Sequence, residues 1–331
     1  MVAVKGPATN PRIVPTGSEG GSGFVLDVTP ANGLVLAVGE VLWDLLPDGP
    51  MLGGAPLNLA VHLRRLDRPS AILTAVGADE PGRQARREIE SQGVEAAWVQ
   101  TSSRHPTGTA LVELKGASPT FEIARPAAYD DLGMDPETLS GIVRASPPAI
   151  AIGTLAQQSP QTRAVTVAVL GACPNAIRFY DANLRDGWDG NLVDDLLESS
   201  TVIKLNEDEA RDIANLLGLS ARDPREFIGD LANQTGARAV CMTRGAEGAV
   251  LLLDGQVVEG LPPAVTPVDT VGAGDAFAAA LLDGILSEDD PGSILRRALA
   301  LGALVATRRG ATPDWHAAEL EAILKATPTP T

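Results

Sequence analysis

Cysteine, histidine and basic residues are all scarce in this 331-residue sequence. The two cysteines, Cys173 and Cys241, are too few for a disulfide framework and have apolar neighbours, so we expect buried thiols and a reducing cytoplasm. Lysine and arginine total 26 against 42 acidic residues, which gives a formal net charge of −16. This charge argues against nucleic acid or an anionic membrane surface as a partner, although helix N-termini can still bind nucleotide phosphates.

Several functional signatures are also missing. His62, His105 and His316 share no metal-ligand spacing, and we interpret all three as incidental. The sequence lacks Gly-x4-Gly-Lys-Ser/Thr, which excludes a P-loop kinase. No strand leads into Gly-x-Gly-x-x-Gly, which argues against a dinucleotide-dependent oxidoreductase. Apolar runs are too short or too interrupted for a membrane span, and we see no charged-then-apolar leader.

The composition that remains is that of a folded globular protein, with 44% hydrophobic and 21% charged residues. Proline, glycine and serine are concentrated near the N-terminus, where Gly17 to Gly23 form one such run. We therefore expect a flexible tail over residues 1–30, one large domain over 31–326 and a disordered end over 327–331.

Buried strands and helices alternate along most of this domain. The first expected strand is 34–38, and it ends in Gly39-Glu40. Further strands are expected at 71–76, 149–152, 177–180, 202–205, 239–243 and 249–253, and helices at 57–66, 81–91, 161–170, 192–198, 207–217, 225–235, 275–286, 294–306 and 316–325. The pattern predicts an α/β fold with a doubly wound, mainly parallel sheet flanked by helices, whose ligands bind at the carboxyl ends of the strands.

Two segments depart from this alternation. Residues 41–54 look like a hairpin, and 95–125 contain short extended pieces without helical periodicity. Strands without intervening helices suggest a small separate sheet, and we expect the two segments to form a β-sheet lid. An exposed edge of such a lid could pair two chains into a homodimer.

The most informative motif lies at residues 269–277, Asp-Thr-Val-Gly-Ala-Gly-Asp-Ala-Phe. Gly272-Ala273-Gly274 allows a tight turn, and an Ala- and Leu-rich helix follows. The free amides and dipole of that helix end favour an anion, and Asp275 in its first turn could take a proton from a hydroxyl attacking a bound phosphoryl group. Alternatively, Asp275 only caps the helix.

A second glycine turn, Gly53-Gly54-Ala-Pro, leads into the helix that carries Asn58. The two glycines let a small ligand approach the backbone, and Asn58 offers a donor and an acceptor to sugar hydroxyls. Asp44 is an acceptor for a pair of hydroxyls. The alternative is a turn with a capping asparagine.

Polar residues follow three later strands. Asp181, Asn183 and Arg185 come after the strand at 177–180, and Arg185 could hold a phosphate or a substrate oxygen. Lys204, Asn206 and Glu209 come next; Asn206 and Glu209 could orient waters around Mg²⁺ or could form a capping box. Thr243, Gly245 and Gly248 could let a nucleotide lie along the backbone, or could form a hairpin turn.

These motifs together resemble the ribokinase-like (PfkB-type) carbohydrate kinases. The string 269–277 resembles the C-terminal signature of that family and 53–60 its N-terminal signature, and the motifs keep the family order over residues 39–311. The resemblance implies ATP and a sugar as small-molecule partners and Mg²⁺ as a cofactor, with K⁺ as a further ion.

The resemblance also assigns roles to residues. It implies Asp275 as the base and Gly272, Ala273 and Gly274 as the anion hole. The sugar side comprises Asp44, Gly53, Gly54, Asn58 and Arg185. The cofactor side comprises Lys204, Asn206, Glu209, Thr243, Gly245, Gly248 and Gly310, with Asn206 and Glu209 near Mg²⁺ through water and Asp269 near K⁺.

Among the members of this family, the sequence looks most like fructokinases. The stretch Phe121-Glu122-Ile123 stands where a 2-keto-3-deoxygluconate kinase is expected to carry Tyr-x-Arg, although Arg125 and Arg185 keep an acid sugar open. Gln157 and Gln158 stand where a ribokinase is expected to place a glutamate. A nucleoside kinase and a non-catalytic sugar-binding regulator remain as alternatives, and the intact Asp275 favours an enzyme over the regulator.

Overall fold

Two β-sheets organise the chain in the computed structural model, which describes residues 33–47, 49–115, 118–185 and 187–331. The predicted tail over 1–30 lies outside these residues. In the described part, the larger sheet has nine strands in the order β13-β12-β11-β10-β9-β8-β1-β4-β5. The strands are β1 (Val35–Val38), β4 (Ser70–Gly77), β5 (Val99–Ser102), β8 (Ala149–Gly153), β9 (Ile177–Asp181), β10 (Val202–Asn206), β11 (Ala239–Thr243), β12 (Ala249–Leu253) and β13 (Gln256–Gly260).

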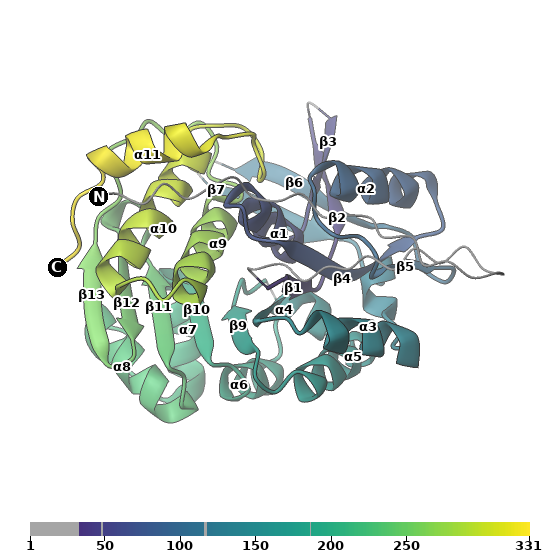
Figure 1. The fold of residues 1–331 in the computed structure, drawn as a ribbon, viewed down its shortest axis with the longest axis horizontal. Coiled ribbons are helices and arrows are strands. Elements are labelled where there is room, and N and C mark those ends of the chain that lie inside the picture. Colours follow the sequence, from purple (N-terminus) through teal and green to yellow (C-terminus); the bar gives the residue numbers. More distant parts are fainter. Residues whose placement is uncertain (1–32, 48, 116–117, 186) are drawn as a thin grey trace, which may run out of the picture.

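This sheet is mainly parallel, as the sequence predicts. Neighbouring strands from β5 to β11 pair in parallel, and only β12 and β13 add antiparallel pairs at one end. Helices alternate with the parallel strands and cover both faces, so the doubly wound α/β architecture is confirmed (Figure 1).

The helices form two layers (Figure 1). One layer contains α1 (Ala55–Arg65), α2 (Glu80–Ser91), α9 (Ala273–Leu286), α10 (Pro291–Ala306) and α11 (Ala317–Ala326). The other contains α3 (Pro136–Ala145), α5 (Pro160–Ala172), α6 (Gly190–Glu198), α7 (Glu207–Leu217) and α8 (Pro224–Thr235), with the short α4 (Thr154–Gln157) at the edge of the site. Two 3₁₀ turns, η1 (Ala128–Asp131) and η2 (Gly245–Glu247), complete the described elements.

Local sequence explains where many helices begin. In α3, α5, α8 and α10, an Asp or Ser accepts a first-turn amide while the next residue is proline, which suits the first helical position. The helix α3 was not expected from the sequence, although Asp135-Pro136 carries this same start signal.

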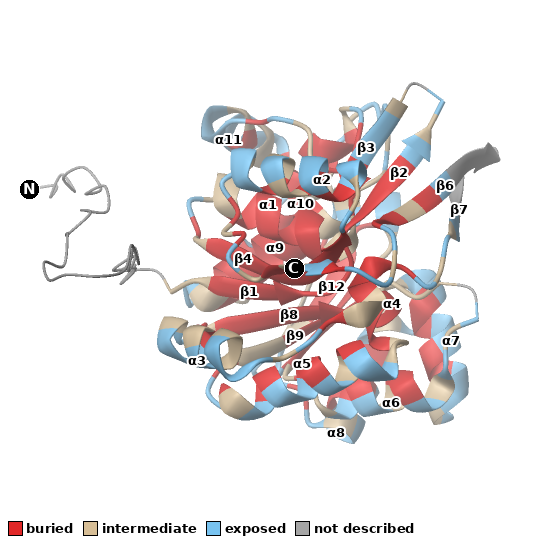
Figure 2. Ribbon diagram, turned by 90° about the vertical axis from the view of Figure 1, so that its right-hand side faces the viewer, coloured by how far each residue is buried: buried red, intermediate tan, exposed pale blue. Residues whose placement is uncertain are grey.

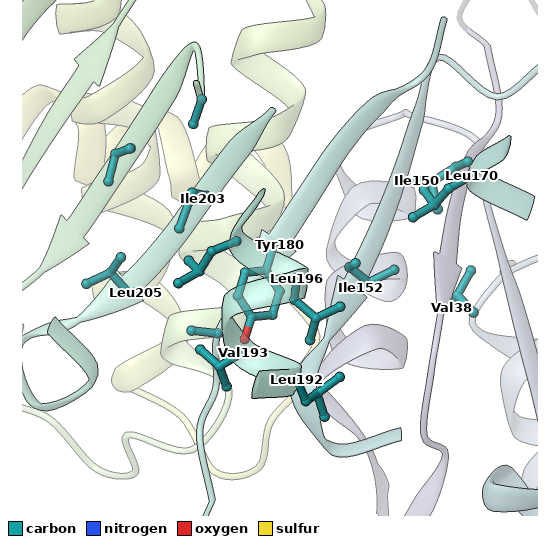
Figure 3. Close-up of a cluster of buried hydrophobic side chains, with 14 of the residues drawn as sticks. Val38, Ile150, Ile152, Leu170, Tyr180, Leu192, Val193, Leu196, Ile203 and Leu205 are labelled. Atoms are coloured by element: carbon teal, nitrogen blue, oxygen red, sulfur yellow. The ribbon is translucent and has the colours of Figure 1, made fainter. Parts of the chain in front are cut away.

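The core lies between the sheet and the two helix layers. Strands β1, β4 and β8 are buried along their whole length, as the red ribbons in Figure 2 show. Figure 3 shows one part of this core, where Ile152, Tyr180 and Ile203 of adjacent strands meet Leu192 and Leu196 of α6. This packing fixes the strand ends that carry polar residues.

The smaller sheet has four strands in the order β3-β2-β6-β7 and stands out from the main body (Figure 2). Its strands are β2 (Leu42–Leu46), β3 (Gly49–Gly53), β6 (Gly108–Lys115) and β7 (Ser118–Ile123). A separate small sheet is therefore present where the lid was predicted.

The predicted lid segment 95–125 is only partly correct. Residues 99–102 form β5, which pairs in parallel with β4 at the edge of the main sheet. Residues 99–102 of the predicted lid segment thus belong to the main sheet, because a short edge strand carries no periodicity that distinguishes it from a lid strand.

The C-terminal end also differs from expectation. The backbone of Thr331 donates to and accepts from Glu259 of β13, each at 2.8 Å, so 327–331 is placed against the sheet instead of forming a disordered end. Two hydrogen bonds to a sheet edge explain this order. In the part of the chain that the structure describes, no helix is both long and apolar enough to cross a bilayer.

Candidate functional site

A cavity of about 370 Å³ opens at the carboxyl ends of the central strands, beneath the small sheet. Its lining comes from the end of β1, the small sheet, α1, the ends of β9, β10 and β11, and the start of α9. Segments far apart in sequence therefore meet at one place, which is where ligands bind in doubly wound sheets.

Asp275 and Asn58 are joined inside this cavity. The Asn58 side-chain amide donates to the Asp275 carboxylate at 2.7 Å, although the residues are 217 positions apart. Asn58 is 5% exposed, and its carbonyl oxygen has no hydrogen-bond partner, so it can accept from a ligand. The two signature motifs thus form one site, with Gly54 also in its lining.

The turn before α9 has the conformation that the glycines predicted. Gly272 is in the left-handed region with φ 75°, and both Gly272 and Gly274 line the cavity. Ala273 does not belong to the lining, and its amide donates to the Thr270 carbonyl at 3.2 Å. The Ala273 amide is thus engaged within the turn, and the anion hole stays a prediction.

Burial changes the acidity of Asp275. Loss of solvent, followed by the nearby Asp181 carboxylate, raises the pKa of Asp275 to about 7, while Asn58 and Lys204 act in the opposite direction. A carboxyl group with a pKa near neutrality can accept a proton and release it again at physiological pH.

Lys204 is placed beneath the glycine turn. Its ammonium group donates to both Asp181 oxygens, at 2.9 and 3.1 Å, and the pair is buried. A Cβ added to Gly274 would lie 3.4 Å from the Lys204 nitrogen. This cation lines the cavity and is held by Asp181 next to the glycine turn, so it is not a freely extended side chain.

The sugar-side residues predicted from the sequence also gather here. Asp44 is 9% exposed, and burial raises its pKa to about 6 while the Arg185 charge lowers it. A side chain at Gly53 would collide with the Asp44 carboxylate, so Gly53 gives that carboxylate its space. Gly54, Arg185 and Asp44 are all in the lining.

Glu40 is an acidic residue that the site prediction did not include. It is 3% exposed, lines the cavity, and one of its carboxylate oxygens has no hydrogen-bond partner. Burial is the main cause that raises its pKa. The signal in the sequence was its position just after the first buried strand.

The pair Asn206 and Glu209 forms a capping box at the start of α7. Asn206 accepts from the Glu209 amide at 2.9 Å, and Glu209 accepts from the Asn206 amide at 2.7 Å. The other Glu209 oxygen accepts from the Leu184 amide at 3.0 Å. Both residues line the cavity, and each Glu209 oxygen already accepts one backbone amide.

The residues around the cavity fit a metal ion that is held mainly by waters and substrate phosphates. Within the described ranges, no three acidic, histidine or cysteine side chains are grouped as a metal cage. Mg²⁺ commonly keeps several waters and binds substrate phosphates, so a cavity without such a cage still fits an Mg²⁺ ion held mainly by phosphates and waters.

The nucleotide-side prediction is only partly supported by position. Thr243 lines the cavity, whereas Gly245 lies exposed on η2. Gly248 has φ 92°, and a Cβ there would meet the Gly260 carbonyl oxygen, so this glycine is needed for packing of β12 against β13. The hairpin interpretation therefore accounts for Gly248.

Asp269 and Gly310 lie together in a neighbouring cavity of about 330 Å³, which also has Asp44 in its lining. The Asp269 carboxylate accepts from the amides of Val271 at 3.0 Å and Gly310 at 2.9 Å. Gly310 thus sits beside the Asp269 loop.

Comparison with known proteins agrees with this geometry. The model of the pfkB family of carbohydrate kinases matches residues 51–318. A fructokinase of Klebsiella pneumoniae is 31% identical over 301 residues, covering 85% of this chain and 95% of that protein. A ribokinase of Haemophilus influenzae is 25% identical over 265 residues, covering 78% of this chain and 82% of the relative.

A solved structure shows the same fold. The crystal structure of a fructokinase double mutant from Vibrio cholerae O395, in its fructose, ADP and potassium ion bound form, superposes with a TM-score of 0.75. It is 25% identical and covers 89% of this chain and 100% of its own.

Proposed function

The chain belongs to the pfkB family of carbohydrate kinases, which are ATP-dependent phosphotransferases, and we propose that it phosphorylates a neutral monosaccharide, fructose above all. The observation that carries this proposal is the Asn58–Asp275 hydrogen bond at 2.7 Å, which joins the predicted sugar side to the predicted base within one cavity. Had Asp275 been packed away from Asn58 and Gly54, the proposal would have failed.

The proposed reaction follows from these positions. A sugar hydroxyl near Asp275 loses its proton to that carboxylate while its oxygen forms a bond to the γ-phosphorus of ATP. The bond from that phosphorus to the leaving oxygen of ADP breaks. Amides of the Gly272 turn and the charge of Lys204 stabilise the negative oxygens of the transferring group. The lid sheet closes over the sugar and excludes water.

Metal ions complete the proposal. Asn206 and Glu209 would orient waters around an Mg²⁺ ion bound with ATP, and that ion would supply positive charge against the phosphates. We propose a K⁺ contact for Asp269, supported by its position beside Gly310 and by the potassium in the Vibrio structure. Adenine and ribose lie near Thr243, with Gly245 and Gly310 as further contacts. Buried free thiols at Cys173 and Cys241 support a reducing, cytoplasmic location.

A neutral sugar is favoured over an acid sugar by the acidic side chains of the cavity lining, which outnumber its two cations, Arg185 and Lys204. Arg125 is paired with Asp130 and also donates to the Leu155 carbonyl at 3.0 Å, so its guanidinium is engaged outside the cavity lining. Glu40, Asp44 and Asp275 all line the cavity, which suits hydroxyl donors and repels a substrate carboxylate. The ribokinase among the relatives keeps ribose as the second candidate.

We also propose a homodimer formed through the lid. Leu45 and Leu111 are in register on β2 and β6, and they are 40% and 45% exposed. Pro50 is paired with Leu45 on the same face. Alternation places Asp44 and Ala110 on the opposite face, toward the cavity, so this apolar face points away from the site and is open to a partner.

The substrate is tested by following ADP release with fructose, ribose, 2-keto-3-deoxygluconate, tagatose 6-phosphate and adenosine. We expect fructose to give the highest kcat/KM. A preference for the carboxylated sugar would overturn the neutral-sugar assignment, and a preference for ribose or adenosine would replace fructose within the same reaction.

The role of Asp275 is tested by Asp275→Asn. Without a base and with the anion hole intact, we expect ADP release to fall by at least about 10²-fold while sugar binding, measured by calorimetry, persists. The matched control is Asp230→Asn, which alters an exposed residue of α8 and should keep wild-type turnover. Retention of most turnover in Asp275→Asn would remove this residue from the mechanism.

A further inference from the structure

One face of α1 contacts two separate segments of the chain, the first turn of α9 and residues 311–313. Asn58, His62 and Arg65 are spaced four and three residues apart, so their side chains lie along the same side of the helix. Asn58 binds Asp275, while His62 is 3.0 Å from the carbonyl oxygen of Ala311. Arg65 donates to the next two carbonyls, those of Thr312 at 2.9 Å and Pro313 at 2.7 Å.

The hydrogen bonds of His62 define its protonation. The Trp315 indole donates to His62 Nδ1 at 3.1 Å, and a tryptophan can only donate. Nδ1 therefore carries no proton, and Nε2–H must donate to the Ala311 carbonyl. The ring is fully buried, and this burial lowers the pKa of His62 to about 4, so the imidazole is neutral. The sequence interpretation of His62 as incidental is not adequate for this network.

The Ala311 carbonyl, which accepts from His62, also contacts Gly272 of the proposed anion hole. A Cβ added to Gly272 would lie 2.3 Å from the Ala311 oxygen and 2.4 Å from its Cα. The Gly272 backbone is thus in direct contact with Ala311, without room for a side chain. Any shift of the Ala311 carbonyl must move Gly272 or leave a gap beneath it.

We propose that His62 is a positioning residue that sets the Gly272 turn of the anion hole through the Ala311 carbonyl. The assignment of this turn as an anion hole rests on the proposed function. Asn58 and His62 lie on the same face of α1. One helix therefore supports both the sugar side and the phosphate side of the site. A displacement of about 1 Å at such a site is enough to cost about 10²-fold in rate.

If His62 only fills space in the core, we expect a different result. In that case, loss of either hydrogen bond costs stability and nothing else, whichever partner is lost. The two bonds can be removed separately. His62→Gln keeps a donor near the Nε2 position and loses the acceptor for Trp315. His62→Asn keeps an acceptor near Nδ1 and is too short to reach Ala311.

The experiment compares these two variants with the wild type in kcat, sugar KM and melting temperature. We expect similar falls in melting temperature, because each variant leaves one buried group unpaired. His62→Gln should stay within about threefold of the wild-type kcat, whereas His62→Asn should fall at least about tenfold. Sugar KM should change less than about threefold in both, since the sugar contacts are retained.

Two further variants keep the test decisive. Trp315→Phe removes the same bond as His62→Gln and should also retain kcat. Where His62→Asn does not fold, His62→Phe takes its place, because it fills the ring volume without a donor. Equal kcat in His62→Asn and His62→Gln at matched melting temperature would overturn the proposal.

Nucleotide binding separates this inference from the proposed function. Calorimetry with ATP in the absence of sugar should show weaker binding to His62→Asn than to His62→Gln by about tenfold. This difference can be measured even where the wild type phosphorylates no sugar tested, an outcome that sinks the proposed substrate but not the role of His62. Equal ATP affinity in both variants, together with equal kcat, would leave His62 a packing residue.

Discussion

At the scale of single residues, Asp275 is distinguished by where its charge is placed. It is buried beside Asp181, and the two cations near it, Lys204 and Arg185, also act on the Asp181 carboxylate. Because its pKa is about 7, Asp275 changes its charge near neutral pH, and the activity of the enzyme should depend on pH in that range.

We predict an acidic limb in the pH profile of kcat/KM with a midpoint near 7. The pKa of Asp275 is raised from 3.8 to about 7, so below pH 7 the carboxyl is protonated and cannot serve as the base. The rate should fall about tenfold per pH unit below the midpoint and level off above it. The measurement is ADP release with fructose at varied pH, with the fold checked by circular dichroism.

Asp44 provides the control, because the pKa of its carboxyl is also raised, to about 6. In Asp44→Asn, we expect a higher sugar KM while the limb near 7 persists in kcat/KM. If the limb instead disappears with Asp44, the titrating group is on the sugar side and Asp275 is not its source.

The residue scale also shows what the sequence could reveal. Asp275, Asn58 and Gly54 were identified because glycine turns next to helices carry a local signal. Glu40 and the engagement of Lys204 by Asp181 were missed, since each depends on contacts between separate strand ends. A local pattern predicts a side chain at a strand end, but its partner is known only when the strand order is known.

At the scale of elements, the first turn of α7 combines capping and a position in the cavity. Glu209 is 5% exposed, and both of its oxygens accept backbone amides. The sequence left capping and Mg²⁺ as alternatives for this residue. The structure confirms the capping box, and the Mg²⁺ role stays a prediction.

We predict that Glu209→Gln lowers both stability and Mg²⁺ response. The glutamine must turn an amide toward one of the two backbone donors, which leaves a buried N–H unpaired and costs about 1–3 kcal/mol. If Glu209 also orients waters around Mg²⁺, the Mg²⁺ concentration for half-maximal activity should rise several-fold. Thermal denaturation and an Mg²⁺ titration of ADP release measure the two effects.

The control is Glu207→Gln in the same helical turn, whose side chain is 52% exposed. It should alter neither quantity by more than a small amount, because an exposed ion pair contributes little. A lower melting temperature with an unchanged Mg²⁺ requirement would make Glu209 a capping residue only.

Helices and strands were predicted best where the hydrophobic pattern agreed with the glycine, proline and capping residues that mark the ends of elements. The buried strands β1, β8 and β10 and the helices that follow β10 and the Gly272 turn were all expected. The edge strand β5 was assigned to the lid, because four residues at an edge show neither a buried run nor a clear alternation. Pairing with β4, which decides the matter, is a long-range property.

At the scale of the whole molecule, the main sheet presents its strand ends and the small sheet covers them. One face of the small sheet, with Leu42, Asp44, Ala110 and Ile123, lines the cavity. The alternation of strands then dictates that Leu45 and Leu111 face outward. The fold class could be predicted from the sequence because the hydrophobic pattern shows strands and helices alternating over long segments, whereas the faces of the lid required the register.

We predict a dimer in solution that is broken by Leu111→Lys. Leu45, Pro50 and Leu111 form an exposed apolar face on the lid, and a lysine buried there would lose its hydration without gaining a partner. Sedimentation velocity over a range of concentrations should show a dimer for the wild type and a monomer for the variant. Val167→Lys is the matched control, since Val167 is 62% exposed on α5 and should leave the dimer intact. A wild type that remains monomeric at high concentration, or a dimer that survives Leu111→Lys, would contradict association through this face.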